Sequence, residues 1–130
     1  MTAKRCLVLG GSGALGRVVC EALAAGGARV AFTWHTGEEV ARDLAGRLEG
    51  AVPLRVDLAG PAGAVEGVVD AAAAELGGLD AFVQCAGLAV PMECAGLDSH
   101  HRIEHVDEAL FDRLMAVNVK STFFACRRVV

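Results

Sequence analysis

Tyrosine is absent from this 130-residue chain, so a phenolic general acid or base is excluded from these residues. Positive charge is also scarce, because 12 Lys and Arg residues against 16 Asp and Glu residues leave a net charge of −4. A sequence-independent nucleic-acid surface needs clustered Lys and Arg, so no nucleic-acid partner is expected. Aromatic residues make up 5% of the chain but hydrophobic residues 54%, which suits one domain with a core of Ala, Val and Leu.

Paired cysteine motifs and long hydrophobic runs are missing as well. The five cysteines are odd in number and show no C-x-x-C spacing. They are Cys6, Cys20, Cys85, Cys94 and Cys126. Most lie inside apolar runs, so we interpret them as buried thiols in a reducing, cytoplasmic compartment. The apolar run after the basic residues 1–5 is soon interrupted by glycines, which makes it too short for a signal sequence or a membrane span, and no membrane partner is expected.

A glycine-rich segment at residues 10–16 follows an apolar run and opens an amphipathic segment. Read as G-x-G-x-x-G, its glycines are Gly11, Gly13 and Gly16. We expect the first to turn the backbone at positive φ, the second to let the chain approach a pyrophosphate, and the third to allow close packing of helix on strand. The phosphates would bind the N-terminal amides of the next helix. An ordinary strand-to-helix turn is the alternative reading of the motif.

Four apolar runs alternate with three amphipathic segments. The runs predict strands at residues 5–9, 28–34, 51–56 and 79–85. The first helical stripe is Leu15, Val18, Val19, Ala22 and Leu23, before Gly26 and Gly27. The second follows a capping box from Thr36 to Glu39 and holds Val40, Leu44 and Leu48. The third begins near Pro61 and holds Val65, Val68, Val69, Ala72 and Leu76. This order predicts an α/β fold, a doubly wound Rossmann-type parallel sheet flanked by helices on both faces.

The last part of the chain holds a long loop and one more helix. No period holds from residue 86 to 106, and a loop of that length usually signals function or local disorder. Asp107 is typical of an N-cap, and the helix that it starts has no Gly, Asn or Pro in residues 126–130 to end it. We therefore expect residues 1–130 to be one domain that is truncated after the fourth strand and the following helix.

Four segments in this order resemble the short-chain dehydrogenase/reductase family. They are the glycine segment, Asp57 after the third strand, Gln84–Gly87 after the fourth, and Met115–Val119 in the last helix. The resemblance is to 3-oxoacyl-carrier-protein-reductase-like and pteridine-reductase-like members, judged by residues 37–39 and 107–114. The chain departs from the family pattern at Leu9, at Ala14 and at Gln84-Cys85, where the family usually has Thr, Gly and Asn-Asn.

The resemblance implies a set of cofactor-binding residues and a catalytic one. Gly10, Ser12, Gly13, Leu15 and Gly16 would line the pyrophosphate, Asp57 and Leu58 would meet the adenine, and Ala86 and Gly87 would pass beside the nicotinamide ribose. Asn118 would match the helix Asn that holds a water in the family's proton relay. The family's catalytic Ser, Tyr and Lys would come from a segment beyond Val130, and its last helix here helps form a dimer, so a homo-oligomer is expected.

The end of the second strand bears on the choice of cofactor. An NAD-preferring site places an acid there, but this sequence reads Thr33-Trp34-His35-Thr36. A 2′-phosphate would meet no repulsion, and His35 with the hydroxyl of Thr33 or Thr36 could bond it. We therefore expect NADP, while the missing confirmatory Arg leaves NAD open.

Several of these residues have a second interpretation. Asp57 could be only a turn residue, and Asn118 could merely satisfy backbone groups on a buried helix stripe. His101 and His105, with His100 and Cys94 nearby, have zinc-like spacing, but we interpret the histidines as solvated loop residues and expect no metal. Nothing basic flanks Cys85 or Cys94 to activate a thiol.

Three functions follow from these observations. The first is a reductase that transfers hydride between NADPH and a small-molecule carbonyl or alcohol, with its catalytic Tyr and Lys absent from this chain. The second is a dinucleotide-binding module without catalysis, and the third is an inactive fragment. The sequence does not identify the substrate.

Overall fold

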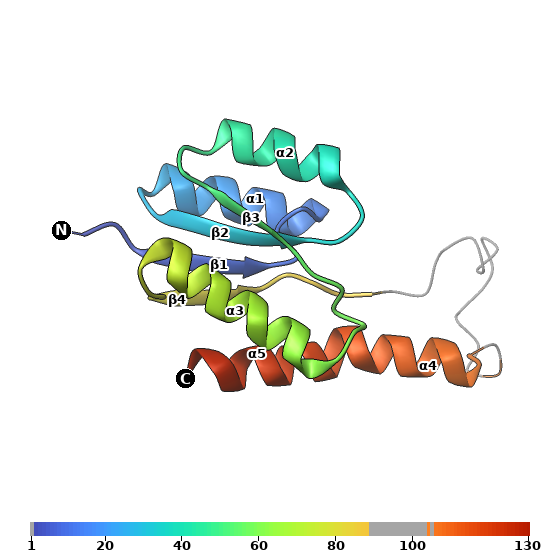
Figure 1. The fold of residues 1–130 in the computed structure, drawn as a ribbon. Helices are drawn as coiled ribbons and strands as arrows, with labels where there is room; N and C mark the ends of the chain where they lie inside the picture. Colours follow the sequence, from blue (N-terminus) through green and yellow to red (C-terminus); the bar gives the residue numbers. More distant parts are fainter. Residues whose placement is uncertain (1, 89–103, 105) are drawn as a thin grey trace.

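The computed structural model describes residues 2–88, 104 and 106–130, and within them four parallel strands form one sheet (Figure 1). The strands are β1 (Arg5–Leu9), β2 (Arg29–Trp34), β3 (Val52–Arg55) and β4 (Ala81–Gln84). Their order in the sheet is β3-β2-β1-β4, and each pair is parallel. Every expected strand is present, with ends that are equal to or shorter than those predicted. The predicted doubly wound α/β fold is therefore confirmed.

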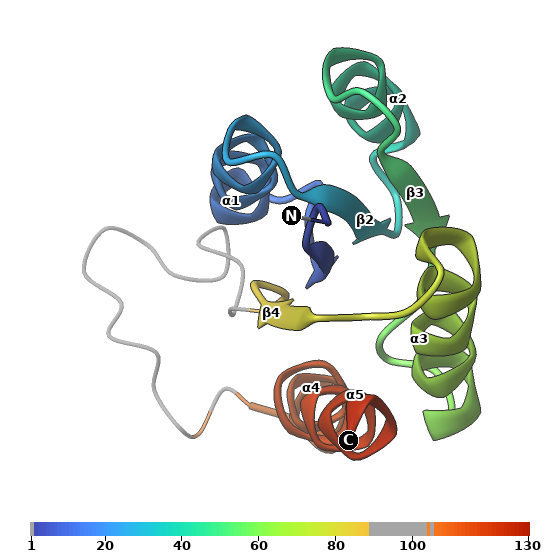
Figure 2. The ribbon, with the colours of Figure 1, turned by 90° about the vertical axis from the view of Figure 1, so that its left-hand side faces the viewer.

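Helices cover both faces of this sheet (Figure 2). One face carries α1 (Ala14–Ala25) and α2 (Glu38–Arg47), and the other carries α3 (Ala62–Leu76) and α5 (Ser121–Val129). Alternate residues of β1 point to opposite faces, so Leu7 and Leu9 belong to the core under α3 while Val8 belongs to the core under α1 and α2. The two α3-side helices are also joined at the surface, where Arg128 Nε donates to Asp70 Oδ1 at 2.7 Å.

The apolar stripes predicted for the first two helices are partly wrong. In α1 the buried residues are Gly16 and Cys20, whereas Leu15 and Val18 are 65% and 61% exposed. The reason is that α1 packs closely against the sheet, and the residue that makes this close packing possible is its glycine, Gly16. In α2, Ala41 and Leu44 are buried and Val40 is 39% exposed. In α3 all five predicted residues, Val65, Val68, Val69, Ala72 and Leu76, are buried.

The caps of two helices test the predicted start signals. The expected capping box from Thr36 to Glu39 is not formed. The N-cap of α2 is Gly37 instead of Thr36, and a glycine has no side chain to accept a capping hydrogen bond. The N-cap at Asp107 is confirmed, since its Oδ1 accepts a hydrogen bond from the Leu110 amide at 2.8 Å.

The expected last helix is present after Asp107, but it contains a π-helical turn that the sequence did not predict. The structure divides it into α4 (Glu108–Met115), a π-helical turn η3 (Ala116–Lys120) and α5. Two side chains of the following turn bond carbonyls four residues back, Ser121 Oγ to the Val117 oxygen at 2.6 Å and Thr122 Oγ1 to the Asn118 oxygen at 3.2 Å. Single π-turns of this kind are frequent at functional sites.

The thiols are less uniformly buried than the sequence indicated. Cys6 and Cys20 are buried, but Cys85 is half-buried and Cys126 is exposed because it lies on the outer side of α5. Burial raises the pKa of the Cys20 thiol to about 12 and also raises the pKa values of Cys6 and Cys85. Each of these described cysteines is a free thiol, whereas Cys94 lies outside the described residues. In the described part of the chain, no helix is both long enough and apolar enough to cross a bilayer.

An ion pair joins β1 to the residue before β4, at the N-terminal end of the sheet. Asp80 accepts hydrogen bonds from the Arg5 amide at 2.8 Å and from the Arg5 Nε and Nη2 at 2.9 Å each. The bonds from Arg5 hold the pKa of this carboxyl well below its usual range.

We expect Asp80→Asn to destabilise the protein more at pH 7 than at pH 3. A carboxyl whose pKa is lowered by folding contributes its full stabilisation above the ordinary Asp range, and this contribution declines as the pH falls through that range. Urea unfolding of the wild type and the variant at both pH values measures the effect. An equal loss of stability at pH 3 and pH 7 would show that the ionised form of Asp80 adds nothing.

Candidate nucleotide-binding site

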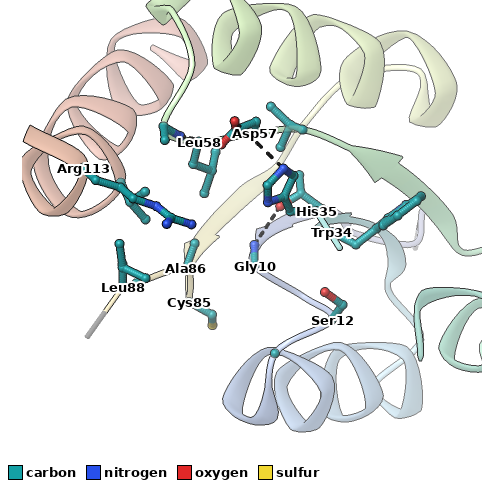
Figure 3. A pocket seen from close by; sticks show the side chains of 16 residues that line it. Gly10, Ser12, Trp34, His35, Asp57, Leu58, Cys85, Ala86, Leu88 and Arg113 are labelled. Atoms are coloured by element: carbon teal, nitrogen blue, oxygen red, sulfur yellow. Dashed lines mark hydrogen bonds and ion pairs between the residues drawn. The ribbon is translucent and has the colours of Figure 1, made fainter. Parts of the chain in front are cut away.

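A pocket of about 260 Å³ lies at the C-terminal ends of the four strands (Figure 3). Of the predicted cofactor-binding residues, those that line this pocket are Gly10, Ser12, Gly13, His35, Asp57, Leu58, Ala86 and Gly87. Two others, Leu15 and Gly16, do not line it: Leu15 is exposed on α1, and Gly16 is buried beneath the glycine turn. The pocket therefore brings together residues from four segments that are far apart in the sequence.

The glycine turn that borders the pocket depends on Gly10 rather than on Gly11. Gly10 has φ of +79°, and a Cβ at this position would lie 2.6 Å from the Ala86 Cα. Its amide donates a hydrogen bond to Thr33 Oγ1 at 2.7 Å. The positive φ predicted for Gly11 is wrong, because Gly11 is instead a buried position where a Cβ would collide with the Phe32 Cβ.

Gly16 has the close packing that the sequence indicated. A Cβ on Gly16 would collide with the Gly10 oxygen and would lie 2.7 Å from the Gly11 Cα. The absence of a Cβ on Gly16 therefore lets the first turn of α1 pack directly against the glycine turn. Gly13 is the N-cap of α1 and offers no side-chain cap, and the first turn of the helix contains no acidic residue. The first amides of α1 are therefore not capped by a side chain of this helix.

The end of β2 meets the segment after β3 on one side of the pocket. His35 Nε2 lies 3.9 Å from Asp57 Oδ2, and Arg55 Nε donates to the His35 oxygen at 3.2 Å. Asp57 Oδ1 also accepts a hydrogen bond from the Ala59 amide at 2.9 Å, so the turn role considered for this residue is present in the structure. Thr33 is buried and its hydroxyl already bonds the Gly10 amide, which makes it a structural residue of the turn.

Asn118 braces the segment that follows β4. Its Oδ1 accepts from the Leu88 amide at 2.7 Å, and its Nδ2 donates to the Leu88 oxygen at 2.8 Å. The side chain thus satisfies backbone groups, as one interpretation predicted, but it is exposed rather than part of a buried stripe. Gln84 holds the same segment from its other end, because its Nε2 donates to Thr122 Oγ1 at 2.7 Å. Together they fix the path of residues 84–88 along the pocket.

Arg113 is the main pocket residue that sequence reasoning missed. It lies on α4 and lines the pocket with Val117, which is one helical turn further along. Arg113 precedes Val117 of the Met115–Val119 motif by four residues, and this helical spacing is a signal that could have found it. Trp34 and Leu88 also line the pocket and were not predicted as site residues.

The zinc-like residues His100, His101, His105 and Cys94 lie outside the described residues. Within the described ranges, no three His, Cys, Asp or Glu side chains gather in a way that could hold a metal ion. Cys85 lines the pocket, but burial raises its pKa, which disfavours the reactive thiolate.

Comparison with known proteins identifies the family. The sequence profile of the short chain dehydrogenases matches residues 4–130, so the chain belongs to the short-chain dehydrogenase/reductase family. No curated protein matches it significantly. Predicted membership is thereby confirmed, and the 3-oxoacyl-carrier-protein-reductase-like or pteridine-reductase-like subtype stays a prediction.

Two of the similar solved structures that follow are named as short-chain dehydrogenases. A short-chain dehydrogenase/reductase of Serratia marcescens BCRC 10948 is 30% identical with a TM-score of 0.85, and a short chain dehydrogenase of Burkholderia cenocepacia J2315, solved with NADP, is 32% identical with a TM-score of 0.85. A blue fluorescent protein from a metagenomic library, solved with NADPH, is 30% identical with a TM-score of 0.84. Each match covers 97% of this chain and 49% of the relative, so the chain spans about half the length of these proteins.

Proposed function

We propose that residues 1–130 are the dinucleotide-binding Rossmann domain of an NAD(P)-dependent oxidoreductase that interconverts a small-molecule carbonyl and an alcohol. The observation that carries this proposal is the pocket at the C-terminal edge of the sheet, bordered by the glycine turn and the start of α1. Ligands of open parallel sheets bind in this place. Family membership and the relatives solved with NADP and NADPH support the proposal.

The residues present fit a dinucleotide. The close approach of Gly10 to Ala86 leaves no room for a side chain, so bare backbone faces the pocket there. The uncapped N-terminus of α1 offers amides and a positive dipole end to a pyrophosphate. We propose that Gly10, Ser12, Gly13, Leu15 and Gly16 hold the phosphates through this turn, Leu15 and Gly16 with their backbone amides. Asp57 and Leu58 would hold the adenine, and Ala86 and Gly87 the nicotinamide ribose.

A bound nicotinamide would supply hydride transfer, and the chain itself positions the cofactor. Asn118 fixes Leu88 and thereby the wall of the pocket beside Ala86 and Gly87. We also propose for Asn118 the role in the proton relay that the family resemblance implies. Because residues 1–130 contain no tyrosine, they supply no phenolic proton donor.

The proposed binding can be tested with the single tryptophan of the chain. Trp34 lines the pocket, and its emission overlaps the absorption of reduced nicotinamide. Titration with NADPH is therefore expected to quench Trp34 fluorescence saturably and to sensitise cofactor emission by energy transfer. The control is free N-acetyl-tryptophanamide at the same absorbance, which corrects for light absorbed by the ligand. Quenching that matches this control at every concentration contradicts the proposal.

Preference for NADP is part of the proposal, because His35 rather than an acid stands at the end of β2. We expect His35→Asp to weaken NADPH binding on the order of tenfold and to leave NADH binding unchanged or tighter, since like charges about 4 Å apart repel by about 1–4 kcal/mol. His35→Asn is the matched neutral control. Titration calorimetry with both nucleotides measures the ratio. If the ratio of the NADPH and NADH affinities were unchanged in His35→Asp, the 2′-phosphate would bind elsewhere or the enzyme would use NAD.

Oligomer formation and a cytoplasmic location are further proposals. Four apolar side chains spaced four residues apart are exposed along α4, η3 and α5, and this row is Phe111, Met115, Val119 and Phe123. Apolar patches of this kind mark protein interfaces, which supports a homo-oligomer. The free thiols support a reducing compartment. A dinucleotide-binding module without catalysis is the second candidate function for residues 1–130 by themselves, because these residues include no tyrosine as a general acid.

A further inference from the structure

Arg113 brings a positive charge into the pocket from the helix layer. Figure 3 shows it reaching from α4 into the pocket, in the region of Leu58, Ala86 and Leu88. No other Lys or Arg among the described residues lines this pocket. Arg113 lies on α4, and the Asp107 side chain caps the start of this helix. The cap fixes the backbone position from which the Arg113 side chain extends.

The guanidinium of Arg113 has no partner within the described part of the chain, whereas seven other arginines there do. Those seven bond carboxylates or backbone oxygens, and they are Arg5, Arg29, Arg42, Arg47, Arg55, Arg127 and Arg128. The Arg17 guanidinium also has no partner among the described residues, but it does not line the pocket. An unpaired guanidinium directed into a pocket is available to a ligand.

The position of Arg113 restricts which part of a dinucleotide it can meet. The pyrophosphate is proposed to bind at the start of α1, and Figure 3 shows Ser12 on the opposite side of the pocket from Arg113, with Gly10 between them. Arg113 therefore enters the pocket from the side opposite the proposed phosphate site. It lies instead on the side of Leu58, where the apolar lining suits a base.

A planar guanidinium recognises either an anion or the face of an aromatic ring. With the phosphates proposed at α1 and beside His35, two rings of the cofactor remain. The oxidised nicotinamide is a cation that repels a guanidinium, so the adenine is the ring that suits Arg113. We propose that Arg113 binds the adenine ring of the dinucleotide by stacking its guanidinium on one face of the base. This inference rests on the proposed function, and it adds an affinity-determining residue from α4 to the pocket formed by the strand ends.

The first test compares Arg113→Met with the wild type in the natural gene product that contains residues 1–130. Calorimetric titrations use NADPH, adenosine and reduced nicotinamide mononucleotide, and Arg42→Met on α2 is the matched exposed control. Stacking predicts that Arg113→Met weakens the binding of NADPH and of adenosine by the same factor, roughly 3- to 30-fold. The affinity for reduced nicotinamide mononucleotide should not change. Arg113→Lys should recover only part of the loss, because an ammonium lacks the planar face.

Each other result overturns a defined part of the proposal. Unchanged NADPH affinity in Arg113→Met, with a wild type that binds, removes Arg113 from the site. A loss for NADPH without a loss for adenosine assigns Arg113 to a phosphate instead of the base. A wild type that binds no NADPH contradicts the proposed function itself.

A second measurement uses only the wild-type protein, so its outcome does not depend on whether a variant folds. In protein with 15N-labelled arginine, a stacked adenine shifts the Arg113 Hε resonance upfield by its ring current when adenosine is added. A resonance that stays in place at saturating adenosine overturns the stacking.

Discussion

Replacing Gly16 with valine is expected to abolish dinucleotide binding and to lower the stability of the fold. The new Cβ would collide with the Gly10 oxygen, which is backbone and cannot rotate away, so α1 must move off the glycine turn. Overpacking of this kind costs typically about 1–3 kcal/mol, and the displaced helix no longer presents its amides to a phosphate. Titration calorimetry with NADPH and urea unfolding measure the two effects.

Gly67→Val is the matched control for this substitution. Gly67 also lies inside a helix, but a Cβ there meets no atom within 4 Å. We expect the control to bind NADPH as the wild type does, because α3 covers the face of the sheet opposite α1 and the new side chain at Gly67 has open space. If Gly16→Val were to keep wild-type affinity, the glycine turn would not be the phosphate site. If both variants lost binding equally, the effect would not be specific to the turn.

The second large effect concerns turnover. A polypeptide of residues 1–130 is expected to bind NADPH and yet to oxidise it with a ketone at a rate near the uncatalysed background. The reason is that it contains no tyrosine, and a positioned general acid typically contributes about 10²- to 10⁴-fold to the rate. The loss of NADPH absorbance in the presence of a panel of ketones and aldehydes measures turnover.

Binding and turnover must be measured on the same preparation, because an unfolded polypeptide would also be inactive. The expected result is saturable quenching of Trp34 fluorescence together with background turnover. Rates typical of enzymes would show that another residue of this chain donates the proton. His35→Asn would then test the imidazole that lines the pocket as the donor, and Asn118→Ala would test the residue that the family resemblance assigns to holding a water in the proton relay.

The parallel sheet with helices on both faces could be predicted from the sequence, since four apolar runs alternate with helical stripes and the α3 stripe has strict helical spacing. The buried faces of α1 and α2 could not be predicted in this way. Both helices contact the sheet through small residues, and the pattern of large apolar residues does not mark these positions. In α1 these are Gly16 and Cys20, and in α2 one of them is Ala41. The interruption of the last helix was missed as well, since its hydroxyl-to-carbonyl bonds at Ser121 and Thr122 leave no apolar signature.

The candidate site was predicted where it depends on local motifs. The residues of the glycine turn, the Asp57 segment and the segment after β4 all lie at the same edge of the sheet, because parallel strands end together. The motif could not tell which glycine takes the positive φ, since that depends on the approach of Ala86 from a distant strand. Arg113 was missed for a similar reason, because only the packing of α4 beside the strand ends brings it to the pocket.

The most direct test of the proposed function is to map NADPH onto the protein by amide chemical shifts in 15N-labelled protein. The expected result is that the perturbed amides cluster at the C-terminal edge of the sheet, at Gly10, Ser12, Gly13, His35, Asp57, Ala86 and Gly87. A second pocket, at the N-terminal ends of the strands, is lined by Lys4, Arg5, Arg29 and Asp80 and serves as an internal control. Perturbations confined to that opposite end, with the glycine turn unchanged, would contradict the proposal that this domain binds its dinucleotide at the Gly10 turn.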